Sequence, residues 1–144
     1  MKHSTRKTLI LILFSIVVIV AIFAVYTVVT NRHGKVIHVT IIDDKDDVVY
    51  DEDIETTQTE LDELLTELND QNEIKFESGS NEGEVRIVGL GEDTLIVEDQ
   101  EENLYWNYYS ENNVQCLENN GCDTIDKLVI EDGDDFIFRL EEIK

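Results

Sequence analysis

Several residue types are scarce in this 144-residue sequence, and each scarcity removes a class of structure or chemistry. There is no proline, so no polyproline segment acts as a rigid spacer between parts of the chain. Only three histidines are present and no G-x-S-x-G motif occurs, whereas nucleophilic catalysis needs a Ser, Thr or Cys beside a base. We therefore expect no enzymatic activity and no catalytic residues.

Charge is absent from residues 9–29, which also hold no glycine. A helix of this length rises about 30 Å, the thickness of the hydrocarbon core of a bilayer. The hydroxyl residues Ser15, Tyr26 and Thr27 form no polar stripe of the kind that a soluble helix would show. The segment predicts a transmembrane helix whose partner is the lipid bilayer.

No acidic residue precedes Asp43, whereas Lys2, Arg6 and Lys7 precede the apolar segment. The positive-inside rule places residues 1–8 in the cytoplasm. We expect a single-pass protein of the cell membrane with a short tether over residues 30–35 and an extracellular domain over residues 36–144. A cleaved signal peptide is the alternative, with residues 21–24 as an imperfect cleavage site. No cysteine follows the apolar segment closely enough for lipoprotein processing.

Basic residues are scarce beyond residue 35, where six of them face all 33 acidic residues, a net charge of about −27. Such a field repels nucleic acid, so we expect no nucleic-acid partner. The acidity is either a solvated surface suited to salty surroundings or a diffuse attractor of cations. The calcium-binding EF-hand motif is absent, because Val48 and Thr56 stand where its glycine is needed.

The exported part alternates between strand patterns and one helical pattern. Leu61, Leu64, Leu65 and Leu68 form an apolar stripe at helical spacing, which ends over residues 69–72. Thr57 with Glu60, or Thr59 with Asp62, has the spacing of a capping box. Strands are predicted over residues 36–42, 48–54, 74–77, 84–89, 94–98, 104–109 and 135–140. This order predicts an α+β fold in which a mixed sheet packs on one helix.

The two cysteines, Cys116 and Cys122, are separated by five residues. An exported location permits a disulfide, which would stabilise the fold by about 2 to 3 kcal/mol at most because the closed loop is small. Free thiols are the alternative. A zinc site would need two further ligands, and the exported part offers only His33 and His38 as histidines. We expect no metal site and no cofactor.

Aromatic residues concentrate in the segment from Tyr105 to Tyr109. On a strand, Trp106 and Tyr108 share one face and Tyr105 and Tyr109 share the other. We expect Trp106 in the core. The two outer tyrosines are either half-exposed surface residues or a flat platform for a ligand, with Asn112 as a third candidate contact.

The region around this segment resembles the transcobalamin C-terminal-like domain of bacterial surface proteins. Four residues carry the first part of the pattern: Trp106, Tyr108, Tyr109 and Asn112. A turn with Gly121 and the triplet Asp132-Gly133-Asp134 before the last strand complete it, and the upstream leucine helix is also similar. Asn113 is a departure, because glycine commonly follows the asparagine in that family. The resemblance implies a β-grasp-like fold with Trp106, Tyr108, Gly121, Asp132, Gly133 and Asp134 as fold-defining residues.

The same resemblance raises cobalamin as a ligand. In the vitamin-binding relatives the ligand lies between this domain and a large helical domain, which this chain lacks. We therefore favour a non-catalytic, membrane-anchored extracellular binding module for an unknown small molecule or surface protein. The alternatives are an acidic cation-sequestering or structural surface protein, and an accessory to a small-molecule importer, a corrinoid importer included.

Overall fold

The chain divides into two compact units, residues 1–33 and residues 34–144, in a computed structural model that describes residues 2–30 and 34–144. The first unit is one helix, α1 (Lys2–Thr30), and the apolar stretch Lys7–Tyr26 is long enough to cross a membrane. The apolar side chains of residues 9–26 are exposed. The predicted helix over residues 9–29 is confirmed, and these features suit an anchor or a signal sequence. Of the predicted tether, residues 31–33 lie outside the described residues, and residue 35 belongs to a strand.

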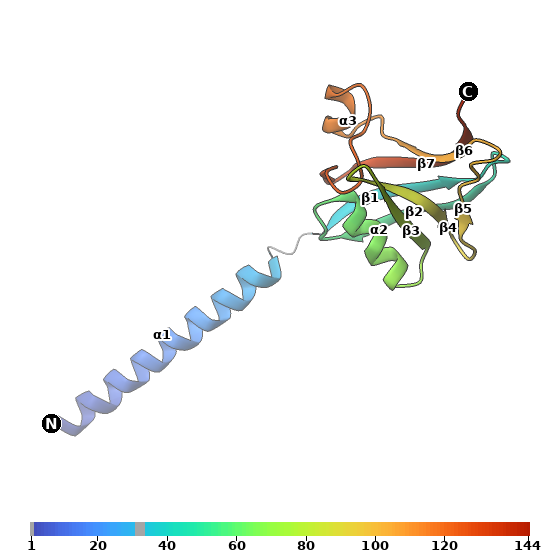
Figure 1. The fold of residues 1–144 in the computed structure, drawn as a ribbon. Helices are drawn as coiled ribbons and strands as arrows, with labels where there is room; N and C mark the ends of the chain where they lie inside the picture. The colour runs from blue at the N-terminus through green and yellow to red at the C-terminus, as the bar shows by residue number, and fades with distance from the viewer. Residues whose placement is uncertain (1, 31–33) are drawn as a thin grey trace. The chain divides into compact units, whose positions relative to one another are not determined.

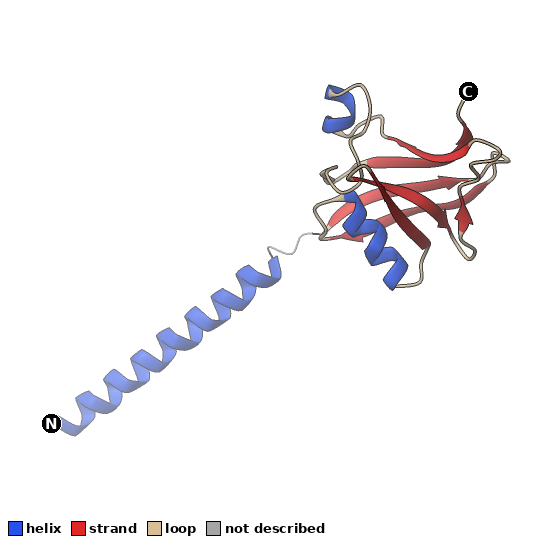
Figure 2. Ribbon diagram, viewed as in Figure 1, coloured by secondary structure: helices blue, strands red, loops and turns tan. Residues whose placement is uncertain are grey.

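The second unit contains two sheets and two helices. Figures 1 and 2 show how these elements are arranged. The four-stranded sheet has the order β2-β1-β7-β6, with β1 (Lys35–Ile42), β2 (Val48–Thr56), β6 (Leu104–Tyr109) and β7 (Asp135–Glu142). Its central pair, β1 and β7, is parallel, and both outer pairs are antiparallel. The second sheet is antiparallel and has the order β3-β4-β5, with β3 (Lys75–Asn81), β4 (Glu84–Gly91) and β5 (Ile96–Val97).

The predicted α+β class and mixed sheet are thus confirmed, but the strands divide between two sheets. The two helices of this unit are α2 (Leu61–Asp70) and α3 (Val114–Glu118). The second is a short helix that the sequence patterns did not predict, because five residues are too few to show a helical period.

Helix α2 packs its leucine stripe into the core, and all four leucines are fully buried. Its predicted capping residues are wrong by one position or more, because Glu60 is the N-cap and forms the capping box with Glu63. The start of the helix is fixed from outside, since the backbone amides of Leu61 and Asp62 donate to carbonyls of the loop at residues 125–128. A contact this distant in sequence has no local signal.

The core lies between the four-stranded sheet, α2 and the second sheet. Strand alternation sends one set of side chains from β1 and β7 inward, with Ile37, Val39, Ile41, Phe136 and Phe138 fully buried. Trp106 is buried as predicted, and its indole Nε1 donates to the carbonyl of Ile96 at 2.9 Å. Tyr108 is half-buried against the same core. The opposite side chains of the four-stranded sheet point to solvent.

Candidate binding surface

The solvent-facing side of the four-stranded sheet, called the outer face here, carries polar side chains from every strand. They include Asp51 and Asp53 on β2, His38 and Thr40 on β1, Asp135, Arg139 and Glu141 on β7, and Asn107 and Tyr109 on β6. The strand register places His38 directly opposite Asp53 on one side and Asp135 on the other. Residues from three strands therefore meet around one imidazole.

His38 is held by a carboxylate at each ring nitrogen. Its Nδ1 lies 2.7 Å from Asp53 Oδ1, and its Nε2 lies 2.9 Å from Asp51 Oδ1. The hydrogen bond to Asp53 raises the pKa of the imidazole, burial opposes this, and the charges of Asp135 and Asp51 raise the pKa further. The three side chains remain 38%, 58% and 72% exposed for His38, Asp51 and Asp53, so water and small ions reach all of them.

This cluster was not singled out from the sequence. The alternation of β1 predicts that His38 lies on the strand face opposite to the one occupied by Ile37 and Val39, and this pattern could have identified His38 as a surface residue. The pairing of β1 with β2 and β7 is what brings the aspartates to it, and that register was not readable from the sequence.

Tyr109 and Tyr105 lie on the same side of β6, as predicted, but their surroundings differ. The Tyr109 ring is 45% exposed, and its hydroxyl donates to Glu141 Oε1, which also accepts from Asn107 Nδ2. Burial and the bond to Glu141 raise the pKa of Tyr109 to about 12. Tyr105 is half-buried, with the Arg86 guanidinium 5.9 Å from its ring centroid. The two rings therefore differ in accessibility, and a shared ligand platform stays a prediction.

Asn112, the third predicted contact, has both of its side-chain polar atoms bound within the chain. Its Nδ2 donates to the carbonyl of Gly133 and its Oδ1 accepts from the amide of Asp135, each at 2.9 Å. These bonds fasten the loop after β6 to the start of β7. The structure thus gives Asn112 a part in the fold, and a ligand contact through it stays a prediction.

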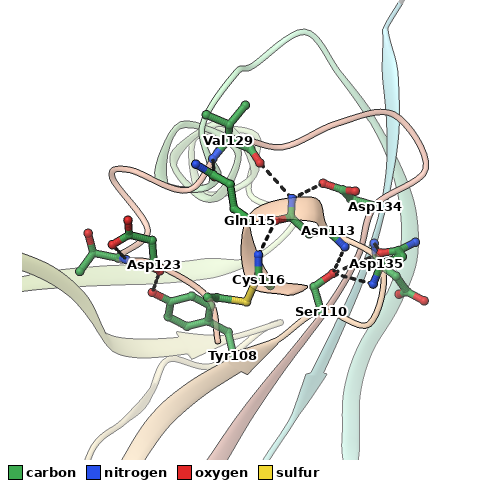
Figure 3. The surroundings of a disulfide bond; sticks show 12 residues. Tyr108, Ser110, Asn113, Gln115, Cys116, Asp123, Val129, Asp134 and Asp135 are labelled. Atoms are coloured by element: carbon green, nitrogen blue, oxygen red, sulfur yellow. Dashed lines mark hydrogen bonds between the residues drawn. A yellow bond between two sulfur atoms is a disulfide. The ribbon is translucent and has the colours of Figure 1, made fainter. Parts of the chain in front are cut away.

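Asn113 is buried beside a disulfide, and Figure 3 shows the group. Its Nδ2 donates to Asp134 Oδ2 at 2.6 Å and to the carbonyl of Val129 at 3.0 Å, and its Oδ1 accepts from the amide of Cys116 as the N-cap of α3. Cys116 is bonded to Cys122 in this structure. A glycine at position 113 would supply none of these side-chain bonds.

Gly133 and Asp132, two residues of the predicted turn before the last strand, each have a structural role there. Gly133 has a φ of +87°, a left-handed conformation that glycine adopts without strain, and its amide donates to the carbonyl of Val36. Asp132 Oδ1 accepts from the amide of Val36 at 2.8 Å. The Asp132-Gly133-Asp134 turn therefore joins the last strand to β1.

The described residues contain no group of three or more His, Cys, Asp or Glu side chains arranged to hold a metal ion. A groove of about 450 Å³ runs along α2, and its lining includes Asp62, Glu63, Glu67 and Asp70. Two of these carboxylates are engaged by the fold, because Glu63 closes the capping box and Glu67 accepts from the Thr56 hydroxyl at 2.6 Å.

The chain consists of an exposed apolar helix followed by a domain of the α+β class that contains two sheets. No model of a known family matches the sequence, and no curated protein matches it. A crystal structure from Ruminococcus gnavus ATCC 29149, described as "a putative metal binding protein", is similar with a TM-score of 0.55 and 23% identity. The match covers 76% of this chain and 99% of that one. At this identity the likeness shows the fold alone.

Proposed function

We propose that this chain is a membrane-anchored, non-catalytic binding module whose domain faces the outside of the cell. The outer face is the binding surface in this proposal. The observation that carries it is the contrast between the two sides of the four-stranded sheet. The inner side is packed into the core, whereas the outer side presents exposed, mutually bonded polar groups around His38 and Tyr109.

The exposed groups of the outer face are held in place before any partner arrives. The Tyr109 ring is fixed through its hydroxyl, and His38 is fixed at both ring nitrogens. Ordering costs on binding are smaller for side chains that are already held. A rigid aromatic ring with a polar edge is also a common kind of contact residue.

A cation is the second candidate partner, and two observations favour it. The part of the chain after residue 35 has a net charge of about −27. The similar crystal structure from Ruminococcus gnavus is described as that of "a putative metal binding protein". Calorimetric titration of the full chain with Ca²⁺ or Mg²⁺ tests it. Saturable binding tighter than about 100 µM would favour a site over diffuse counter-ion screening.

The membrane part of the proposal is tested by fractionation and protease access. An outward-facing domain is digested by protease added to intact cells, while the protein stays in the membrane fraction. Recovery of the intact chain from the cytosol would overturn both the anchor and the outward orientation.

The binding part is tested by a screen for ligands that raise the melting temperature of the full chain in detergent micelles. A ligand of the outer face should stabilise the wild type and the Val97→Ala variant, which changes an exposed side chain of the other sheet. It should stabilise Tyr109→Ala much less. Hits that stabilise all three proteins equally would place binding elsewhere and refute the assignment of this surface.

A further inference from the structure

We propose that His38 and Asp51 form a two-ligand site for a six-coordinate, first-row divalent cation on the outer face, with Asp53 as the positioning residue. The remaining coordination positions are filled by water. This inference deepens the proposed function by naming a ligand class for the outer face, and it rests on that face being a binding surface.

The spacing of the two ligand atoms fits an octahedral ion. Nε2 of His38 and Oδ1 of Asp51 are 2.9 Å apart. Two ligands about 2.1 Å from one ion and at a right angle lie about 3 Å apart, whereas a tetrahedral angle separates them by about 3.4 Å. An ion beside the line that joins these two atoms can therefore contact both of them at about 2.1 Å with little change in their separation.

The other ring nitrogen is already arranged as it is in histidine metal sites. A metal-bound histidine usually donates its second N–H to a carboxylate, which fixes the tautomer and the ring orientation. Asp53 Oδ1 lies 2.7 Å from Nδ1 and supplies that carboxylate. With the proton on Nδ1, Nε2 is left as the unprotonated ring nitrogen, 2.9 Å from Asp51 Oδ1.

Asp51 is oriented as well, because the hydroxyl of Thr40 donates to its Oδ1 at 3.1 Å. Asp135 faces His38 from β7 and adds a third negative charge near the ring. The exposure of His38 and Asp51, 38% and 58%, leaves room for the water ligands.

Protons compete for the same nitrogen, so binding depends on pH. The charged groups facing His38 are Asp51 and Asp53 from β2 and Asp135 from β7. A cation binds the neutral imidazole and displaces the proton. Affinity should therefore increase as the pH rises through the pKa of His38 and level off above it.

The test is a Co²⁺ titration of the isotope-labelled full chain in detergent micelles, followed by NMR of the His38 ring and the backbone amides. We expect a saturable change centred on His38 and Asp51. His38→Asn should abolish it, Asp51→Asn should weaken it, and Asp53→Asn should weaken it about tenfold or more. Glu52→Gln is the matched control, because Glu52 lies between the two aspartates on β2 but on the opposite side of the strand. It should bind as the wild type does.

The role of Asp53 as a positioning residue has its own readout. The Asp53 carboxylate fixes the tautomer and orientation of the His38 ring, so Asp53→Asn should alter the ring nitrogen shifts of the metal-free protein as well as weaken Co²⁺ binding. Ca²⁺, which has little affinity for imidazole, should leave the His38 ring signals unchanged.

Two results would overturn the inference. One is Co²⁺ binding that persists unchanged in His38→Asn, and the other is a wild-type titration with no saturable change at His38. In either case the proposed binding module is judged separately by the melting screen and its Tyr109→Ala variant, which involve neither His38 nor a metal. Circular dichroism spectra of all variants show whether the fold is retained.

Discussion

Replacing Asn113 with alanine should destabilise the domain far more than its loop position suggests. The side chain is 1% exposed and makes three bonds, to the carbonyl of Val129, to Asp134 Oδ2 and from the amide of Cys116. Alanine removes all three at once. Asp134 is 5% exposed. After the substitution its Oδ2 still accepts a hydrogen bond from the amide of Glu131 but has lost the one from Asn113.

The magnitude follows from two separate losses. Removing the N-cap of a helix costs about 1 kcal/mol. Taking away one of the two bonds of a buried acceptor, here Asp134 Oδ2, costs about 1 to 3 kcal/mol. The sum is about 3 kcal/mol, which corresponds to a fall in melting temperature of roughly 10 °C or more for a domain of this size.

The assay is urea unfolding of the full chain in micelles, followed by tryptophan fluorescence, because Trp106 is the single tryptophan and is buried in the core. Asn119→Ala is the control, since Asn119 is exposed at the other end of α3 and its side chain makes no hydrogen bond among the described residues. It should change the free energy of unfolding by less than about 0.5 kcal/mol.

A second variant separates the capping bond from the buried pair. Asn113→Asp keeps an acceptor for the amide of Cys116 but places a carboxylate against Asp134. It should be destabilised at neutral pH and recover part of the loss at acid pH, where one of the two carboxyl groups is protonated. If Asn113→Ala costs less than about 0.5 kcal/mol, the reasoning that this network holds the loop is refuted.

The remaining predictions concern the disulfide and the tyrosines. Replacing Cys116 and Cys122 together with serine should lower the free energy of unfolding by about 2 kcal/mol, because the bond closes only a seven-residue loop in the unfolded chain; a denaturation midpoint unchanged from that of the wild type would contradict this. Burial, the first cause in each case, raises the pKa values of Tyr50, Tyr108 and Tyr109 to about 12, so an absorbance titration should show three phenols that ionise well above the usual value of about 10. Because the folded state keeps these protons longer than the unfolded state, stability is fully present below about pH 10 and is lost as the pH rises toward 12. Phenols that all ionise together near pH 10 in the folded protein would refute the assigned burial.

Local sequence patterns predicted many of the helices and strands. The uncharged run predicted α1, the leucine stripe predicted α2, and alternation located β1, β2, β4, β6 and β7 to within a few residues. Each of these signals is contained in its own segment, since it reflects which side chains avoid water. The inward direction of Trp106 followed from the same rule.

The candidate site was less predictable. The sequence predicts the tyrosine pair because aromatic residues are rare and easily recognised. The two tyrosines differ in their surroundings, however, because Arg86 from the other sheet contacts the ring of Tyr105. The structural use of Asn112 depends on Gly133 and Asp135, more than twenty residues away. Neither partner has a local signal near Asn112.

By itself, the sequence determined the membrane-length helix, the acidic charge of the remainder, the α+β class and the faces of the main strands. Those properties follow from composition and period, which act within a segment. The tertiary structure alone decided that the strands form two sheets, that a distant loop sets the start of α2, and that His38 lies between Asp51 and Asp53. Alternation determines which face a side chain occupies, but strand order and register determine its neighbours, and these depend on how the whole core packs.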